Sequence, residues 1–273
     1  MVTERVTRIA SLSMAAILLD VEGVLEVSGT PLPGAAEAVA RLREDGHRLR
    51  FVTNSTTHSR TALADEIRSF GIELEDGELQ TTGAVAARAL RGRRVLALTM
   101  PGIVEDLEGV ELVGEQAEAV LIGGADETPE TNRVFSYMNL ARAFAELDAG
   151  AELYCLHRNR WWQTSRGPLL DSGAFVAGLE YAAEVAATVL GKPSPAYFGA
   201  ALEVLDADPD QAWIVGDDLE SDVAGGQQAG LRTVLVRTGK FRADELAHSR
   251  VRPDALLDSL ADLPAFLGEG PRG

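Results

Sequence analysis

The sequence contains little that would tie the chain to an oxidising compartment or a membrane. Cys155 is the only cysteine among 273 residues, so no disulfide can form within the chain. The longest apolar runs fall far short of the about 18 residues that a membrane helix requires. Residues 1–13 carry charges but no apolar signal-peptide segment, and we expect them to be a tail on a cytoplasmic protein.

Positive charge is scarce as well. The chain has 25 basic residues against 42 acidic ones, a net charge of −17, which argues against nucleic acid or an anionic membrane as a partner. An anionic substrate would have to be attracted by local cations and not by the overall field. Only Lys192 and Lys240 are lysines, and we interpret Lys240 as a solvated surface residue.

Apolar runs of strand length alternate with alanine-rich helical stretches along most of the chain. This alternation is typical of a parallel sheet covered by helices, and hence of the α/β class. Residues 15–19 form a continuous apolar run, as expected for a strand buried on both faces. Similar runs recur near residues 95–99, 119–122 and 152–156, with one helix predicted over 132–147. In such sheets the binding crevice lies beyond the carboxyl ends of the strands, so polar residues there are the candidate site.

Two of the predicted strands end in residues that suit phosphate chemistry. Asp20 follows the first run directly, and a carboxylate held at the tip of a buried strand can act as a nucleophile or a metal ligand. The ordinary alternative is an aspartate that caps a turn or a helix. Thr53 and Asn54 follow the next strand, where a hydroxyl and free N–H groups at a helix start either cradle phosphate or cap the helix.

The other candidate residues lie in the last third of the chain. Lys192 stands between Gly191 and Pro193, where a compact ammonium could neutralise a phosphoryl oxygen or could simply be solvated. The segment 217–222 places three aspartates within six residues, which repel one another unless a cation compensates. Carboxylate ligands with open positions favour Mg²⁺, and the alternative is an acidic, solvated loop. Jointly, these strand ends predict that Asp20 attacks phosphorus beside Mg²⁺.

The order of these residues resembles the four motifs of the haloacid dehalogenase (HAD) superfamily, here Asp20, Thr53, Lys192 and 216–222. About half of the chain separates the second motif from the third, which resembles an inserted type IIA cap. Residues 169–182 and 189–193 are similar to one subgroup, that of the phospholysine phosphohistidine inorganic pyrophosphate phosphatases and their relatives. The resemblance implies a Rossmann-like parallel-sheet core, residues 1–83 and 188–273, with an α/β cap at 84–187.

The same resemblance implies roles for the candidate residues. Asp20 would form an aspartyl-phosphate and would bind Mg²⁺ together with Asp217 and the backbone carbonyl of Glu22. The residues that would hold the phosphoryl group are Thr53, Asn54 and Lys192. Asp218 and Asp222 would not bind the metal directly, but would contact its water ligands or Lys192 and hold them in place.

One position departs from the family pattern. In most phosphatases of the superfamily that this chain resembles, an Asp two residues after the nucleophile is the general acid for the leaving group. This chain has Glu22 at that position. Glutamate keeps the acid but lengthens the side chain by one methylene. Our hypothesis is that Glu22 still acts as the acid/base. The alternative is that its side chain turns aside and only its carbonyl serves.

Substrate selection is expected from the cap segment 155–162, since a lid supplies contacts that the core lacks. Arg160 or Arg158 could meet a second anionic group, and Trp161 or Trp162 could stack on a ring. Equally, the tryptophans could belong to the cap core and the arginines to the surface.

The expected function is Mg²⁺-dependent hydrolysis of small phosphorylated compounds. A homodimer is compatible with this expectation. Phosphoryl transfer by a phosphotransferase or mutase on the same scaffold stays open, because only water access separates it from hydrolysis. A weakly active, phosphate-binding regulatory module is the other alternative. Dehalogenation is disfavoured because it needs no Mg²⁺, whereas the sequence has two candidate phosphate-binding motifs and a candidate metal-binding cluster. A receiver domain is rejected because its acidic pair would come early in the chain.

Overall fold

A six-stranded parallel sheet carries the candidate residues in the computed structural model, which describes residues 14–75, 77–164 and 167–269. The strand order is β15–β14–β13–β1–β4–β5, and every neighbouring pair is parallel. The strands of this sheet are β1 (Ala16–Asp20), β4 (Arg48–Val52), β5 (Leu79–Gln80), β13 (Ala212–Gly216), β14 (Arg232–Val236) and β15 (Ala255–Leu257).

Helices cover both faces of this sheet, which explains the unbroken apolar run of β1. Alternate residues of a strand point to opposite faces. Ile17 and Leu19 accordingly pack in a cluster with α1 and α2, whereas Ala16 and Leu18 pack against α8. The helices and short helical segments of this part of the chain are α1 (Ala35–Glu44), α2 (Arg60–Ser69), α8 (Pro195–Leu205), η1 (Pro209–Gln211), the π-helical η2 (Leu219–Ala224), α9 (Gly225–Gln228), α10 (Ala243–His248), η3 (Leu260–Asp262) and α11 (Leu263–Glu269).

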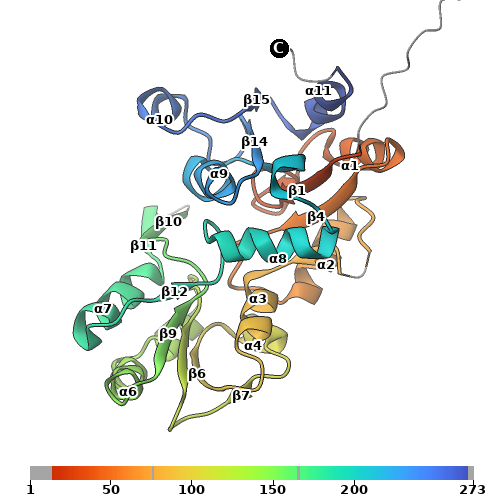
Figure 1. The fold of residues 1–273 in the computed structure, drawn as a ribbon. Helices are drawn as coiled ribbons and strands as arrows, with labels where there is room; N and C mark the ends of the chain where they lie inside the picture. Colours follow the sequence, from red (N-terminus) through yellow and green to blue (C-terminus); the bar gives the residue numbers. More distant parts are fainter. Residues whose placement is uncertain (1–13, 76, 165–166, 270–273) are drawn as a thin grey trace, which may run out of the picture.

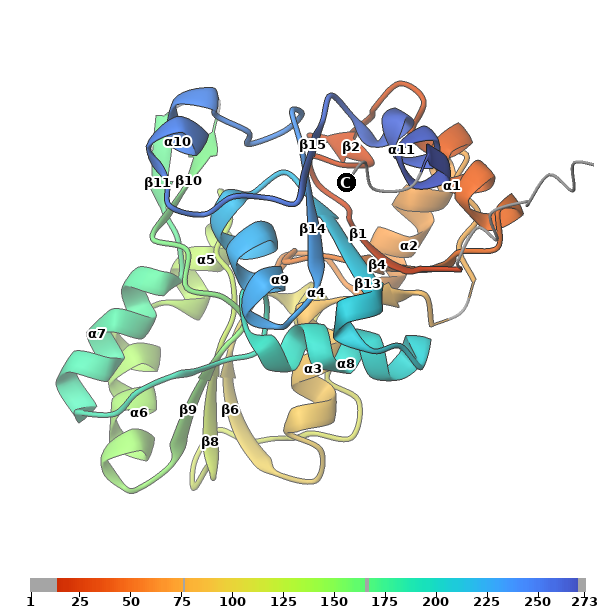
Figure 2. The ribbon, with the colours of Figure 1, turned by 45° about the horizontal axis from the view of Figure 1, so that its top comes forward.

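The middle of the chain forms a second parallel sheet, in the order β12–β9–β8–β6–β7. Its strands and helices are α3 (Thr82–Ala89), β6 (Arg94–Leu98), α4 (Pro101–Asp106), β7 (Glu111–Leu112), β8 (Ala119–Ile122), α5 (Pro129–Val134), α6 (Tyr137–Asp148), β9 (Glu152–Cys155), α7 (Gly173–Ala183) and β12 (Thr188–Val189). Figures 1 and 2 show this sheet and its helices, in yellow and green, as a separate part of the molecule beside the first sheet. We call the two parts the cap and the core.

The structure corrects several boundaries. Strand β12 pairs with β9 in the cap sheet, so residues 188 and 189 do not lie in the core sheet, where the predicted boundary put them. The single helix expected over 132–147 is two helices, because Ser136 accepts a hydrogen bond from the Asn139 amide and begins α6. Two hairpins were not predicted: β2 (Glu26–Val27) with β3 (Thr30–Pro31), and β10 (Trp161–Thr164) with β11 (Gly167–Leu170). The predicted tail, residues 1–13, lies outside the described residues.

The α/β class and the parallel sheets are thus as predicted. Strands β4 and β13 flank β1 with Asp20 opposite Val52 and Leu19 opposite Val215. This register places the residues that follow β4 and β13 next to Asp20 at one edge of the sheet. Across the described ranges, no helix is both long and apolar enough to span a bilayer.

Candidate active site

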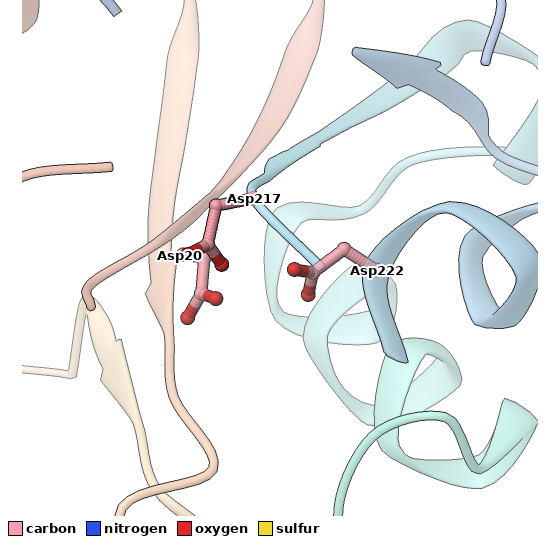
Figure 3. A group of neighbouring side chains, drawn as sticks. All are labelled: Asp20, Asp217 and Asp222. Atoms are coloured by element: carbon pink, nitrogen blue, oxygen red, sulfur yellow. The ribbon is translucent and has the colours of Figure 1, made fainter. Parts of the chain in front are cut away.

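Three carboxylates converge at the carboxyl edge of the core sheet. Asp20 ends β1, Asp217 directly follows β13, and Asp222 lies in η2. One oxygen from each lies within 4.8 Å of the others, and all three residues are buried. Figure 3 shows Asp20 and Asp217 side by side at their strand ends, with Asp222 facing them. The π-helical turn turns Asp222 back toward the strand ends, and such turns are common at functional sites.

Lys192 forms ion pairs with two of these carboxylates, Asp20 and Asp222. Its Nζ lies 2.8 Å from Asp20 Oδ1 and 2.7 Å from Asp222 Oδ1, and the side chain is only 2% exposed. Burial by itself would lower the pKa of Lys192, but the adjacent carboxylates outweigh it and hold the pKa well above its ordinary value. The two carboxylates thus favour the charged form of the ammonium.

One ammonium does not compensate three carboxylates. Burial, followed by repulsion from Asp20 and Asp222, raises the pKa of Asp217 to about 8. Burial likewise raises the pKa of Asp222 to about 7, although Lys192 opposes the shift. Such raised values report an excess of negative charge in a desolvated site. A bound cation would relieve this excess.

The oxygens left over show where a cation fits. Asp222 uses both oxygens, one for Lys192 and one for the Asp218 amide. Asp20 uses Oδ1 for Lys192 and the Val21 amide, and Asp217 uses Oδ2 for the Lys240 amide. Within the described part of the chain, Asp20 Oδ2 and Asp217 Oδ1 have no hydrogen-bond donor. Hard, uncommitted carboxylate oxygens of this kind fit Mg²⁺.

Two glycines lie where the main chain passes closest to the Asp217 carboxylate. A Cβ atom on Gly23 or on Gly239 would lie 1.9 Å from Asp217 Oδ2, and both residues have positive φ, +81° and +58°. Thr238 Oγ1 also donates a hydrogen bond to the Gly23 carbonyl oxygen. The loop after β14 therefore closes over Asp217 together with the loop after Asp20.

Tyr197 and Asn54 fix the segment after β4. The Tyr197 hydroxyl accepts a hydrogen bond from the Thr53 amide at 2.9 Å, and Thr53 Oγ1 accepts one from the Ser55 amide at 3.0 Å. Asn54 contacts only the main chain of Lys192: Oδ1 accepts from its amide at 2.8 Å and Nδ2 donates to its carbonyl oxygen at 2.9 Å. These two side-chain hydrogen bonds position the Lys192 main chain. The Asn54 amide N–H is left without an acceptor among the described residues.

Two predicted residues lie at the rim. The Glu22 side chain is exposed, and its carbonyl oxygen accepts no hydrogen bond from any residue that the structure describes. Asp218 caps η2 by accepting hydrogen bonds from the Glu220 and Ser221 amides, both at 2.9 Å. Asp222 lies 2.7 Å from Lys192 Nζ, whereas Asp218 is used at the start of η2.

Lys240 is exposed, as we interpreted it, but its main chain contacts the site. Its side chain is 57% exposed, yet its amide donates to Asp217 Oδ2 at 2.6 Å and its Nζ lies 3.9 Å from Asp218 Oδ2. The scarcity of lysine was the only signal in the sequence that set this residue apart.

The cap contributes a buried histidine that the sequence did not single out. His157 Nε2 lies 3.2 Å from Thr56 Oγ1 of the core and 3.7 Å from Asp171 Oδ1. Burial lowers the pKa of His157, with Asp171 opposing the shift and Lys240 adding to it. A neutral imidazole therefore bridges cap and core close to the segment after Thr53.

The predicted selectivity residues differ in where they point. Arg158 donates to Glu180 of α7 at 2.6 Å and so is used within the cap. Arg160 is exposed, and Trp161 is 55% exposed at the start of β10. The side chain of Trp162 lies outside the described part of the chain.

Known proteins are similar to this chain in sequence and in fold. Residues 17–113 match the family model of haloacid dehalogenase-like hydrolases, and residues 189–263 match a HAD-hydrolase-like model. The phospholysine phosphohistidine inorganic pyrophosphate phosphatase of Xenopus laevis is 38% identical over 255 residues, which cover 90% of this chain and 92% of that protein.

Solved structures agree with the sequence relatives. The p-nitrophenyl phosphatase of Archaeoglobus fulgidus superposes with a TM-score of 0.85 at 28% identity, covering 92% of this chain and 98% of that one. A glycerol phosphate phosphatase of Mycobacterium tuberculosis, solved in complex with magnesium, gives 0.81 at 26% identity and covers 96% and 81%. With its core sheet, inserted cap and carboxylate cluster, the chain belongs to the haloacid dehalogenase-like hydrolases.

Proposed function

We propose that this hydrolase removes phosphoryl groups from small phosphorylated compounds, with Asp20 as a covalent nucleophile and Mg²⁺ as its cofactor. The observation that carries the proposal is the position of Asp20. Its carboxylate is held by Lys192 at 2.8 Å and by the Val21 amide at 2.8 Å, at the tip of the central strand. One oxygen is thereby fixed and the other is left facing the site.

The chain's own groups can carry out both halves of the reaction. An Asp20 oxygen attacks phosphorus, the bond from phosphorus to the leaving oxygen or nitrogen breaks, and the leaving atom takes the electron pair. The exposed Glu22 carboxyl supplies the proton to that atom. A water deprotonated by Glu22 then attacks the aspartyl-phosphate, which releases phosphate and restores the Asp20 carboxylate. Lys192, the Thr53 hydroxyl and the Asn54 amide bind the other phosphoryl oxygens.

The proposed metal ligands are Asp20, Asp217 and the carbonyl oxygen of Glu22. When bound, Mg²⁺ would offset the negative charge of the site and of the phosphoryl oxygens. Support comes from the uncommitted oxygens of Asp20 and Asp217, from the raised pKa of Asp217, about 8, and from the magnesium bound by the mycobacterial neighbour. Asp222 would hold Lys192 in place through their ion pair, and Asp218 would hold the start of η2 by accepting its amide hydrogen bonds.

The names of the similar proteins bound the substrate class. They cover phosphoanhydrides and phosphoramidates in the animal relative and phosphate monoesters in the structural neighbours. Arg160 is the proposed contact for the remainder of the substrate, because it is exposed on the segment that leads into β10. Phosphoryl transfer to another acceptor, and phosphate binding with weak activity, are the competing functions.

Phosphate release from p-nitrophenyl phosphate tests the proposal directly. We expect hydrolysis with Mg²⁺, none after EDTA, and a loss of at least about 10³-fold in Asp20→Asn, in line with removal of other covalent nucleophiles. Asp208→Asn is the matched control, because this exposed carboxylate lies before η1, away from the site. An acid-stable phosphoryl group on the wild type that hydroxylamine releases, and that is absent from Asp20→Asn, would identify the intermediate. Equal activity of Asp20→Asn and Asp208→Asn would contradict the proposal.

A further inference from the structure

Lys240 is held beside the reactive centre by its main chain. It follows Gly239 in the loop between β14 and α10, and its amide N–H donates to Asp217 Oδ2 at 2.6 Å. This bond belongs to the backbone and fixes where the side chain begins. Replacing the side chain would therefore leave the contact with Asp217 in place.

The ammonium of Lys240 is close to carboxylates but is bonded to none of them. Its nearest carboxylate oxygen is Asp218 Oδ2 at 3.9 Å, which is beyond hydrogen-bond distance. Asp218 already accepts two hydrogen bonds from the start of η2. With 57% of the side chain exposed, the three N–H donors of the ammonium are available to a ligand.

The charge of Lys240 lies between the core site and the cap. On the side of the core, the Lys240 amide is bonded to Asp217 and its Nζ lies 3.9 Å from Asp218 Oδ2. The same charge reaches the cap, where it helps to lower the pKa of His157. In both views α10, which follows the lysine, lies on the same side of the molecule as the cap hairpin β10–β11 (Figures 1 and 2).

A hollow at the rim gives access to this charge. A cavity of about 140 Å³ lies beside Lys240, and its charged lining residues are Asp217, Asp218, Glu220, Lys240, Arg242 and Glu245. Lys192, in contrast, is 2% exposed, and its ammonium is paired with Asp20 and Asp222. Lys240 is therefore the lysine that can meet the outer part of a substrate. Without it, Glu22 and Asp218 would repel an anionic group placed there.

We propose that Lys240 binds the anionic oxygens of the leaving group and so makes the site favour substrates that carry a second ionised group beyond the transferred phosphoryl. The inference rests on the proposed phosphatase function, because it assigns the outer half of the same site. Pyrophosphate is the simplest such substrate, since its leaving group is itself a phosphate. A p-nitrophenyl ester lacks the second ionised group.

Two substrates and three variants separate the roles. Lys240→Met removes the charge and keeps the aliphatic stem, Lys240→Arg keeps a cation, and Arg237→Met removes one charge from the same loop. Arg237 is a matched control because it is exposed and pairs with Asp258, away from the carboxylates of the site. For Lys240→Met we expect kcat/KM for pyrophosphate to fall about 10- to 100-fold, mostly through KM, as for loss of one charged hydrogen bond. Hydrolysis of p-nitrophenyl phosphate should change by less than about threefold, Lys240→Arg should recover most of the loss, and Arg237→Met should affect neither substrate.

A binding measurement keeps this inference apart from the proposed function. With Mg²⁺ present, calorimetry should show methylenediphosphonate binding Lys240→Met about tenfold or more weakly than the wild type, with orthophosphate binding unchanged. A wild type that hydrolyses neither substrate would refute the proposed function, and weaker diphosphonate binding would still support the role of Lys240. Equal diphosphonate binding by wild type and Lys240→Met, or an equal loss on both substrates, would overturn the inference.

Discussion

At the scale of single residues, the carboxylates of the site differ in how much of their hydrogen-bonding capacity the fold already uses. Asp222 has both oxygens committed, to Lys192 and to the Asp218 amide. Asp20 and Asp217 each keep one oxygen free of donors among the described residues. The pair Asp20 and Asp217 can therefore change partners during a reaction, whereas Asp222 can only hold Lys192 in place.

Gly239→Ala should disable this pair without unfolding the protein. The added Cβ would lie 1.9 Å from Asp217 Oδ2, so the carboxylate or the loop after β14 has to move. A displacement near 1 Å at a reactive group costs about 10²-fold, and we expect a loss of that order in kcat/KM. Gly71→Ala is the control, since it also places an alanine at a positive φ, +81° against +58° at Gly239, but its Cβ meets no atom within 4 Å. Similar activity of the two variants would show that contact with Asp217 is unimportant.

Glu22→Gln should impair substrates according to their leaving group. An amide cannot donate a proton to the departing oxygen, so an alkyl phosphate should lose about 10²-fold or more in kcat. p-Nitrophenyl phosphate, whose leaving group needs little protonation, should lose far less. The pH–rate profile with the alkyl ester should also lose the limb that reports the acid. Unchanged kcat and an unchanged profile would leave only the Glu22 carbonyl with a role.

At the scale of elements, one short helix of the cap is tied to one helix of the core. Asp106 at the end of α4 accepts hydrogen bonds from the Arg60 amide at 2.9 and 3.0 Å and from Thr81 Oγ1 at 3.2 Å. Gly102 of α4 brings the two backbones together, since a Cβ there would lie 2.8 Å from the Ser59 amide nitrogen. The contact thus satisfies a free N–H at the start of α2 and fixes the cap beside the site.

The stability supplied by Asp106 should depend on pH. Burial raises the pKa of Asp106, with the Arg60 and Thr81 hydrogen bonds opposing the shift. A carboxyl whose pKa is higher in the folded than in the unfolded chain contributes its stability below the unfolded pKa, about 3.9, and loses it as pH rises through the folded pKa. The free energy of unfolding of the wild type relative to Asp106→Asn should therefore decrease as urea titrations move upward from about pH 4. A difference that grows with pH would contradict the assignment.

At the scale of the whole molecule, the negative charge is both a general property and a local one. The chain carries a net charge of −17, and the site concentrates three buried carboxylates around one ammonium. An anionic substrate approaching such a molecule is repelled at long range. Cations at the site, from the chain and from a bound metal, have to reverse that repulsion locally.

Mg²⁺ should consequently stabilise the folded chain as a whole. At a concentration about 100 times its dissociation constant, a ligand that binds only the folded state adds about 2.7 kcal/mol. For a chain of this length, that corresponds to a rise of about 5–10 °C in Tm. Asp217→Asn should abolish the rise, and NaCl at equal ionic strength should not reproduce it in the wild type. A shift of the same size in Asp217→Asn would place the cation elsewhere.

The sequence by itself determined the class of fold and pointed to Asp20, Thr53 and Asp217, because each follows an apolar run at the end of a core strand. Parallel strands bring such ends to one edge of a sheet, so their proximity follows from local pattern. Lys192 follows β12 of the cap sheet, and its place beside Asp20 is a tertiary contact. Only the tertiary structure decided which groups pair there.

Asn54 and Lys192 are 138 residues apart in the chain, and no local pattern reveals that they share two hydrogen bonds. The contacts of His157 and Lys240 cannot be read from the sequence for the same reason. Their environments are made by the cap folding over the core and by the loop after β14 crossing Asp217. Such contacts depend on the path of the whole backbone, which the alternation of apolar and polar residues does not encode position by position.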